Sequence, residues 1–127
     1  AEKLDKSLNS DVKGQGYIFA KYSIETGVDP YLAVAVMLQE TGCKWNCSYL
    51  ASKCNNYGGQ KGAPGCNGGS YKKFDTQEEG IKSYITNLYD NYISKGLTTP
   101  EQINKRYASD PNWSKKINRY INEIKSK

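Results

Sequence analysis

Hydrophobic and polar positions along this chain of 127 residues recur mainly at the spacing of an α-helix. A first helix is expected from about Asp11 to Thr26, and Gly27 is expected to end it. A second helix is expected from Pro30 to about Thr41, and its residues from Leu32 to Leu38 are apolar without a break. Because a helix that is apolar on every side must be buried, we expect this second helix in the middle of the domain.

Local start and stop residues define the remaining helices. Asp29 is the expected N-cap of the second helix, with Pro30 at its first position. Thr76 and Glu79 form a capping box that predicts the start of a third helix. A fourth, short helix is expected from Thr99-Pro100, and a last helix from Asp110-Pro111. The last helix carries apolar residues on one face: Trp113, Ile117, Tyr120, Ile121 and Ile124.

Residues 43–74 hold six of the twelve glycines and show no helical period. This region is expected to form loops, with one short β-hairpin around Asn67-Gly68. The chain therefore predicts a mostly α fold with an irregular middle region. Its length is that of one domain, so residues 1–127 are expected to form a single unit that acts as a monomer.

Composition narrows the class of protein. The net charge is +5, and basic residues become more frequent towards the C-terminal end. This charge favours a polyanionic partner such as an anionic cell wall, and the alternative is that the basic residues form solvated helix faces. No nucleic-acid-binding motif accompanies the charge, so no nucleic-acid partner is expected. The longest apolar run is far below the roughly 20 residues that span a bilayer, which argues against membrane insertion. The polar start shows no signal peptide, so a mature form or an excised domain is expected.

Four cysteines, Cys43, Cys47, Cys54 and Cys66, lie close together in the irregular region. Their even number favours two disulfides and an oxidising compartment, and the sequence leaves three pairings open. The alternative is a four-thiolate zinc site, although the spacings lack the paired short intervals typical of such sites. Histidine is absent, which excludes histidine-based triads and histidine metal ligands. No metal or other cofactor is expected.

Glu40 is the only acidic residue between Asp29 and Asp75. It lies at the C-terminal end of the most apolar helix, where the helix dipole and apolar surroundings both favour the protonated carboxyl group. Such a group can donate a proton to the leaving oxygen of a glycosidic bond. The structural alternative is that Glu40 caps the helix end or pairs with Lys44 at i+4.

Four segments, in order, are similar to those of a known family. Val28 to Gly42 resembles the catalytic-acid helix of the lysozyme-like superfamily, which ends in Glu, then Ser or Thr, then Gly. Leu50 to Gly62 resembles the Asn-Asn-aromatic-Gly segment of the bacterial endo-β-N-acetylglucosaminidases of glycoside hydrolase family seventy-three. Tyr71 to Thr76 resembles the entry to their next helix, and Tyr107 to Trp113 resembles their Tyr-Ala-Thr-Asp-Pro segment.

This resemblance implies a lysozyme-like α-helical domain that cleaves the glycan strands of peptidoglycan, secreted or associated with the cell wall. It implies a general-acid role for Glu40 and a role for Tyr107 in supporting the transition state. Aromatic and amide side chains near the acid are candidates for binding sugar rings and N-acetyl groups, although Asn55 and Asn56 could equally hold a tight turn. The substrate-binding candidates are Gln39, Trp45, Asn55, Asn56, Tyr57 and Tyr71.

One departure from the family leaves the mechanism open. Many members present a second carboxylate in the middle region, whereas this chain has no Asp or Glu from Thr41 to Phe74. Asp75, Glu78 or Glu79 could reach the site, the N-acetyl group of the substrate could act as nucleophile, or a sugar hydroxyl could attack internally, as in lytic transglycosylases. The alternatives to a glucosaminidase are therefore a muramidase or lytic transglycosylase, and a catalytically silent glycan-binding module.

Overall fold

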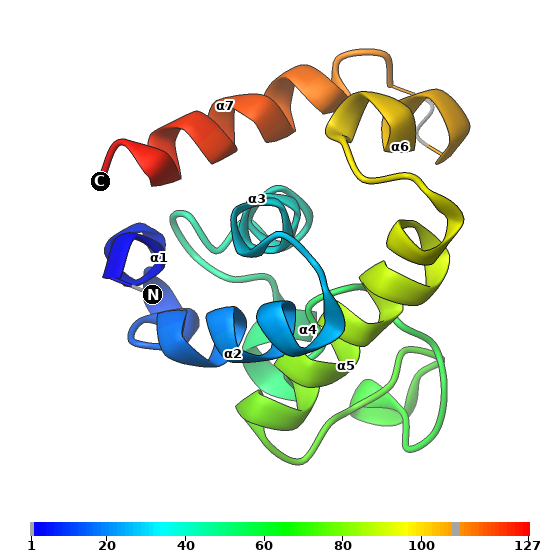
Figure 1. Cartoon of the computed structure of the whole chain (residues 1–127). Coiled ribbons are helices and arrows are strands. Elements are labelled where there is room, and N and C mark those ends of the chain that lie inside the picture. Colours follow the sequence, from blue (N-terminus) through cyan, green and yellow to red (C-terminus); the bar gives the residue numbers. More distant parts are fainter. Residues whose placement is uncertain (1, 108–109) are drawn as a thin grey trace.

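The computed structural model of the chain describes residues 2–107 and 110–127, and for Tyr107 it describes the backbone only. The described residues form seven α-helices and three short 3-10 helices (Figure 1). The α-helices are α1 (Glu2–Ser7), α2 (Gly16–Thr26), α3 (Pro30–Thr41), α4 (Tyr49–Cys54), α5 (Gln77–Asn91), α6 (Pro100–Tyr107) and α7 (Trp113–Lys125). The 3-10 helices are η1 (Ser10–Val12), η2 (Cys66–Gly68) and η3 (Ile93–Lys95). The predicted mostly α fold is confirmed.

Helix α3 lies in the centre of the helices, as its apolar sequence predicts (Figure 1). Every residue from Leu32 to Leu38 is buried, and α7 and α2 pack against the helix. The Tyr84 hydroxyl of α5 donates a 2.6 Å hydrogen bond to the Ala33 carbonyl oxygen and so ties α5 to the same core. Burial of this central helix supplies the main hydrophobic stabilisation of the domain.

The predicted boundaries of α3 are confirmed by its caps. The Asp29 carboxylate accepts a 2.9 Å hydrogen bond from the Tyr31 backbone N–H, and Pro30 occupies the first turn. At the other end Gly42 has φ +72°, a left-handed conformation that suits glycine. The chain therefore turns away sharply two residues after Glu40.

The predicted start of the first helix is wrong. Helix α2 begins at Gly16, because Gly14 takes φ +84° and interrupts the helical run from Asp11. The Asp5 carboxylate of α1 accepts a 2.6 Å hydrogen bond from the Gly16 backbone N–H and stabilises this later start. The preceding helix α1, which includes buried Leu4, was not predicted.

Helix α7 also begins later than predicted, at Trp113. The Asp110 carboxylate accepts a 2.8 Å hydrogen bond from the Asn112 backbone N–H, which holds Asp110 to Asn112 in a turn. This backbone bond, together with Lys116, lowers the pKa of Asp110. The capping residues Thr76 and Thr99 do start α5 and α6, and each hydroxyl accepts from the backbone N–H three residues on.

The middle region is less irregular than predicted. Residues 49–54 form α4, whose N-cap Ser48 accepts a hydrogen bond from the Ala51 backbone N–H. The expected hairpin around Asn67-Gly68 is present as two isolated antiparallel bridges, Lys61 to Tyr71 and Gly65 to Lys72.

Two disulfides lie in the same middle region, one joining Cys43 to Cys47 and the other joining Cys54 to Cys66. The prediction of two disulfides is confirmed, and since the bridges use all four thiols, the alternative of a thiolate zinc site is wrong. No helix in the described part of the chain is both long and apolar enough to cross a membrane.

Candidate active site

Glu40 is the second-last residue of α3, and its side chain lies at the edge of a pocket of about 190 Å³. The carboxylate is exposed, so the predicted enclosure of this group by apolar residues is wrong. The apolar residues lie beside it, in the pocket wall. Glu40 is thus accessible to a ligand from solvent while it faces a largely apolar cavity.

Trp113, the first residue of α7, donates from its indole nitrogen to Glu40. The Nε1–Oε1 distance is 3.3 Å, and the contact joins residues 73 positions apart in the sequence. The alternative pairing of Glu40 with Lys44 is wrong, because the Lys44 ammonium lies 2.8 Å from the Glu123 carboxylate. The hydrogen-bond partner of the Glu40 carboxylate in the described part of the chain is therefore a neutral donor.

The pocket wall is formed by α3, α5, α6, α7 and the loop after α4. Its lining residues are Val36, Glu40, Gly58, Tyr84, Asn87, Leu88, Tyr92, Ile103 and Trp113. Among these described lining residues Glu40 is the only carboxylate. Burial raises the pKa of Tyr84 well above its usual value, and the nearby negative charge of Glu40 raises that pKa further. The pocket therefore contains one exposed acid beside a tyrosine that stays protonated.

Asn56 and Tyr57 lie in the interior, which contradicts their predicted contact with substrate. Each is only 1% exposed. The Asn56 amide donates to the carbonyl oxygens of Gln60 and Lys72, both at 2.8 Å, and its Oδ1 accepts from the Gln60 backbone N–H at 3.1 Å. Tyr57 packs edge-on against Phe19, with ring centroids 6.4 Å apart. Both side chains hold the loop in place, and neither presents a surface to a sugar.

Asn55 also has a structural contact. It is the C-cap of α4, in the left-handed conformation at φ +53°, and its amide donates a 3.0 Å hydrogen bond to the Phe74 carbonyl oxygen. The alternative that this asparagine pair holds a turn therefore accounts for both residues. Their effect on the site is indirect, because the turn brings Gly58 into the pocket wall, where an added Cβ would lie 3.1 Å from the Tyr84 ring.

The other predicted contacts lie outside the wall of this pocket. Gln39 is half-buried beside Glu40 on α3, Trp45 is 74% exposed in the loop closed by the first disulfide, and Tyr71 is 44% exposed on the hairpin. Their substrate-binding roles stay predictions. The prediction for Tyr107 concerns a side chain outside the described residues.

Sequence reasoning missed the pocket roles of Trp113, Asn87, Leu88 and Tyr92. Trp113 belongs to the apolar face predicted for the last helix, which favours a place in the core, and the side chain is indeed half-buried. Its position two residues after Pro111, within the segment from Tyr107 to Trp113 that resembles the family, is a signal that could have identified it.

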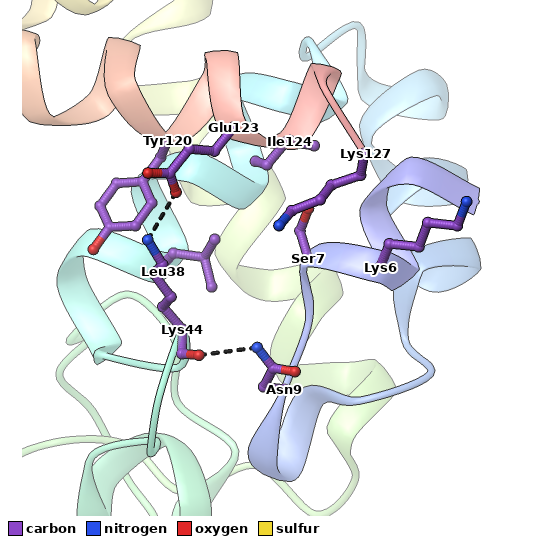
Figure 2. A pocket seen from close by; sticks show the side chains of 9 residues that line it. All are labelled: Lys6, Ser7, Asn9, Leu38, Lys44, Tyr120, Glu123, Ile124 and Lys127. Carbon is purple, nitrogen blue, oxygen red and sulfur yellow. Dashed lines mark hydrogen bonds and ion pairs between the residues drawn. The ribbon is translucent and has the colours of Figure 1, made fainter.

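A second, smaller pocket of about 50 Å³ lies between α1, α7 and the end of α3 (Figure 2). The Lys44–Glu123 ion pair crosses it, and the Asn9 amide donates a 2.9 Å hydrogen bond to the Lys44 carbonyl oxygen. Together these contacts attach the loop after Glu40 to α7 and to the segment that follows α1. The contacts across the small pocket thus have a structural role, because they help to fix the position of the larger pocket.

Comparison with known proteins gives one family. The glucosaminidase family model, described as mannosyl-glycoprotein endo-beta-N-acetylglucosaminidase, matches residues 16–126. Two proteins of Streptococcus pneumoniae, from strains TIGR4 and R6, are each 28% identical to the whole of this chain and are provisionally named endo-beta-N-acetylglucosaminidases. The chain spans about a fifth of the length of these relatives, 20% and 19% respectively.

Proposed function

The chain belongs to the glucosaminidase family, and from this premise we propose that it cleaves β-1,4 glycosidic bonds in the glycan strands of peptidoglycan as an endo-β-N-acetylglucosaminidase. Glu40 is the general acid. The observation that carries this role is the position of a single exposed carboxylate at the edge of a pocket with a directed hydrogen-bond donor, Trp113.

The indole of Trp113 leaves one oxygen of Glu40 free. Because an indole N–H can only donate, the oxygen that faces it, Oε1, acts as an acceptor. In this proposal the other oxygen, Oε2, carries the acidic proton of the neutral carboxyl group. From there it passes to the bridging oxygen as the bond from that oxygen to the anomeric carbon breaks.

The group that works opposite Glu40 comes from the substrate in this proposal. The Glu78 carboxylate accepts a 2.5 Å hydrogen bond from the Tyr22 hydroxyl on α2, and Glu79 is not among the residues that line the pocket of Glu40. Both lie in the first turn of α5, whereas Tyr84, Asn87 and Leu88 of the same helix line the pocket of Glu40. The acetamido oxygen of the substrate attacks the anomeric carbon, and water then completes hydrolysis.

The absence of a second pocket carboxylate among the described residues also favours one alternative. In a lytic transglycosylase, a hydroxyl of the muramic acid residue attacks internally and one carboxyl group suffices. A secreted or wall-associated location fits both reactions, since disulfides persist in oxidising compartments. The basic net charge of +5 suits a polyanionic wall.

The test is digestion of purified peptidoglycan with the wild type and with Glu40→Gln, followed by mass spectrometry of the new chain ends. New reducing N-acetylglucosamine ends are expected from the wild type, with a loss of about 10²- to 10⁴-fold in the variant. Reducing muramic ends would identify a muramidase, and anhydro-muramic ends a transglycosylase. Binding without new ends would identify a glycan-binding module, and equal cleavage by both proteins would remove Glu40 from the mechanism.

A further inference from the structure

A polar groove of about 480 Å³ runs along α5 next to the pocket of Glu40. The two share Asn87, and the residues beside it on α5 alternate between them, with Tyr84 and Leu88 in the pocket and Ser83 and Thr86 in the groove. The pocket and the groove are therefore neighbouring parts of one depression. An extended chain bound at Glu40 would continue into the groove.

The asparagine turn fixes one wall of this groove. The buried Asn56 side chain bonds both the N–H and the carbonyl oxygen of Gln60, and the Lys72 backbone N–H donates to the same carbonyl at 2.8 Å. The Gln60 side chain then reaches α5, where its Nε2 donates to the Ser83 hydroxyl at 2.9 Å. Gln60 is thus held by its backbone and by one end of its amide.

The other end of the Gln60 amide has no partner. Its Oε1 is buried and makes no hydrogen bond with the described residues. A buried acceptor without a donor costs free energy, so Gln60 gains from any ligand that brings an N–H or O–H within reach. Gln60 lines the groove, and because the torsion of a terminal amide is broad, rotation can present this oxygen to a ligand there in exchange for the bond to Ser83.

We infer that this groove is a binding subsite for an N-acetylated sugar of the glycan strand, with Gln60 as the residue that recognises the acetamido group. The inference rests on the proposed function, because it extends the same substrate beyond the cleaved bond. The amide of Gln60 and the hydroxyls of Ser83 and Thr86 match the amide and hydroxyl groups of such a sugar.

The chemistry of the groove favours a neutral sugar over a charged ligand. Phe74 supplies an apolar surface against which the C–H face of a ring can pack. The charged residues in the lining are balanced, since Lys72 and Lys82 are matched by Glu79 and Asp90. Two lysines beside two carboxylates leave no net charge for selecting an anion.

The test measures binding, so that it does not depend on cleavage. Chitotetraose, which carries acetamido groups, and cellotetraose, which has hydroxyls in their place, are titrated by calorimetry into the Glu40→Gln protein. The same titrations are made with Gln60→Met, Thr86→Val and, as a matched control, Gln15→Met added to that background. Gln15 lies at the start of α2 and is absent from the lining of both cavities. Thr86 is exposed, so Thr86→Val tests the groove even if Gln60→Met folds poorly.

The expected result is that Gln60→Met and Thr86→Val each raise the Kd for chitotetraose about three- to tenfold, the effect of losing one hydrogen bond to a ligand. Gln15→Met should leave that Kd unchanged, and Gln60→Met should not affect the weaker binding of cellotetraose. Equal chitotetraose affinity in all these proteins, or no chitotetraose binding at all, would overturn the subsite. Wild-type cleavage of peptidoglycan is assayed separately, so the proposed function can hold even where the subsite fails.

Discussion

Replacing Trp113 by phenylalanine tests whether the indole positions Glu40, the proposed catalytic acid. The change removes the N–H that donates to Glu40 and keeps an aromatic ring at the start of α7. The donor–acceptor distance of 3.3 Å is long beside the roughly 2.7–2.9 Å of strong charge-assisted bonds, and Glu40 is exposed. We therefore expect a contribution below that of such bonds, about 1 kcal/mol.

A loss of about 1 kcal/mol in the transition state corresponds to a fall of about fivefold in kcat. KM should change little, because a group that orients the acid acts on the reacting bond. The assay is the steady-state release of reducing ends from soluble glycan strands. A benzothienyl analogue of tryptophan at position 113, in which sulfur replaces the N–H, should behave like Trp113→Phe, because it preserves the shape of the side chain.

Tyr120→Phe is the matched control, since it removes one donor from the same helix at a residue outside the pocket of Glu40. A benzothienyl variant with wild-type kcat would refute the positioning role. A raised KM with unchanged kcat would also contradict it, and would make Trp113 a surface for substrate binding.

Three further predictions concern stability. Gly80→Ala should lower the midpoint of thermal unfolding by several degrees, because the new Cβ would lie 1.9 Å from the Asn55 carbonyl oxygen. The same change in a helix with free space around it stabilises by about 1 kcal/mol, so a raised midpoint would show that the contact relaxes. The hydrogen bond to Glu78 raises the pKa of Tyr22 to about 12, so the stabilisation that this bond gives is complete below about pH 10 and is lost as the pH rises towards 12. Denaturant titrations of Tyr22→Phe at a series of pH values should lack this loss, and the same pH dependence of stability in both proteins would contradict the assignment. Replacing both cysteines of the Cys54–Cys66 bridge by serine should cost about 3 kcal/mol in chemical denaturation, whereas an unchanged midpoint would mean that the hairpin holds without its cross-link.

The helices that could be predicted from the sequence are those with local signals at their ends. Asp29, Thr76 and Thr99 each cap the helix that follows, because capping involves residues only two or three positions apart. Helices α1 and α4 have six residues each, too few to establish a period, and they depend on burial against the rest of the domain. Their formation is a tertiary effect that local patterns do not contain.

The residues of the candidate site also fall into those visible in the sequence and those that depend on tertiary contacts. Glu40 could be proposed as a candidate acid because an isolated acidic residue at the end of an apolar helix is visible in the sequence itself. Its contact with Trp113 brings together two distant segments, and helical spacing alone placed that tryptophan in the core. Asn56 and Tyr57 were misassigned because amide and aromatic side chains suit both sugar binding and loop support, and only their burial distinguishes the two.

The pairing of the cysteines has a consequence for how this protein can be produced. Each bridge joins two cysteines that follow one another in the sequence, Cys43 with Cys47 and Cys54 with Cys66. Of the three possible pairings, this is the one in which every thiol meets its partner in the order in which the chain is made. A chain delivered from its N-terminal end into an oxidising compartment can therefore form both bridges in order. Such a route requires an oxidant for the thiols, and it does not require an isomerase to correct earlier pairs.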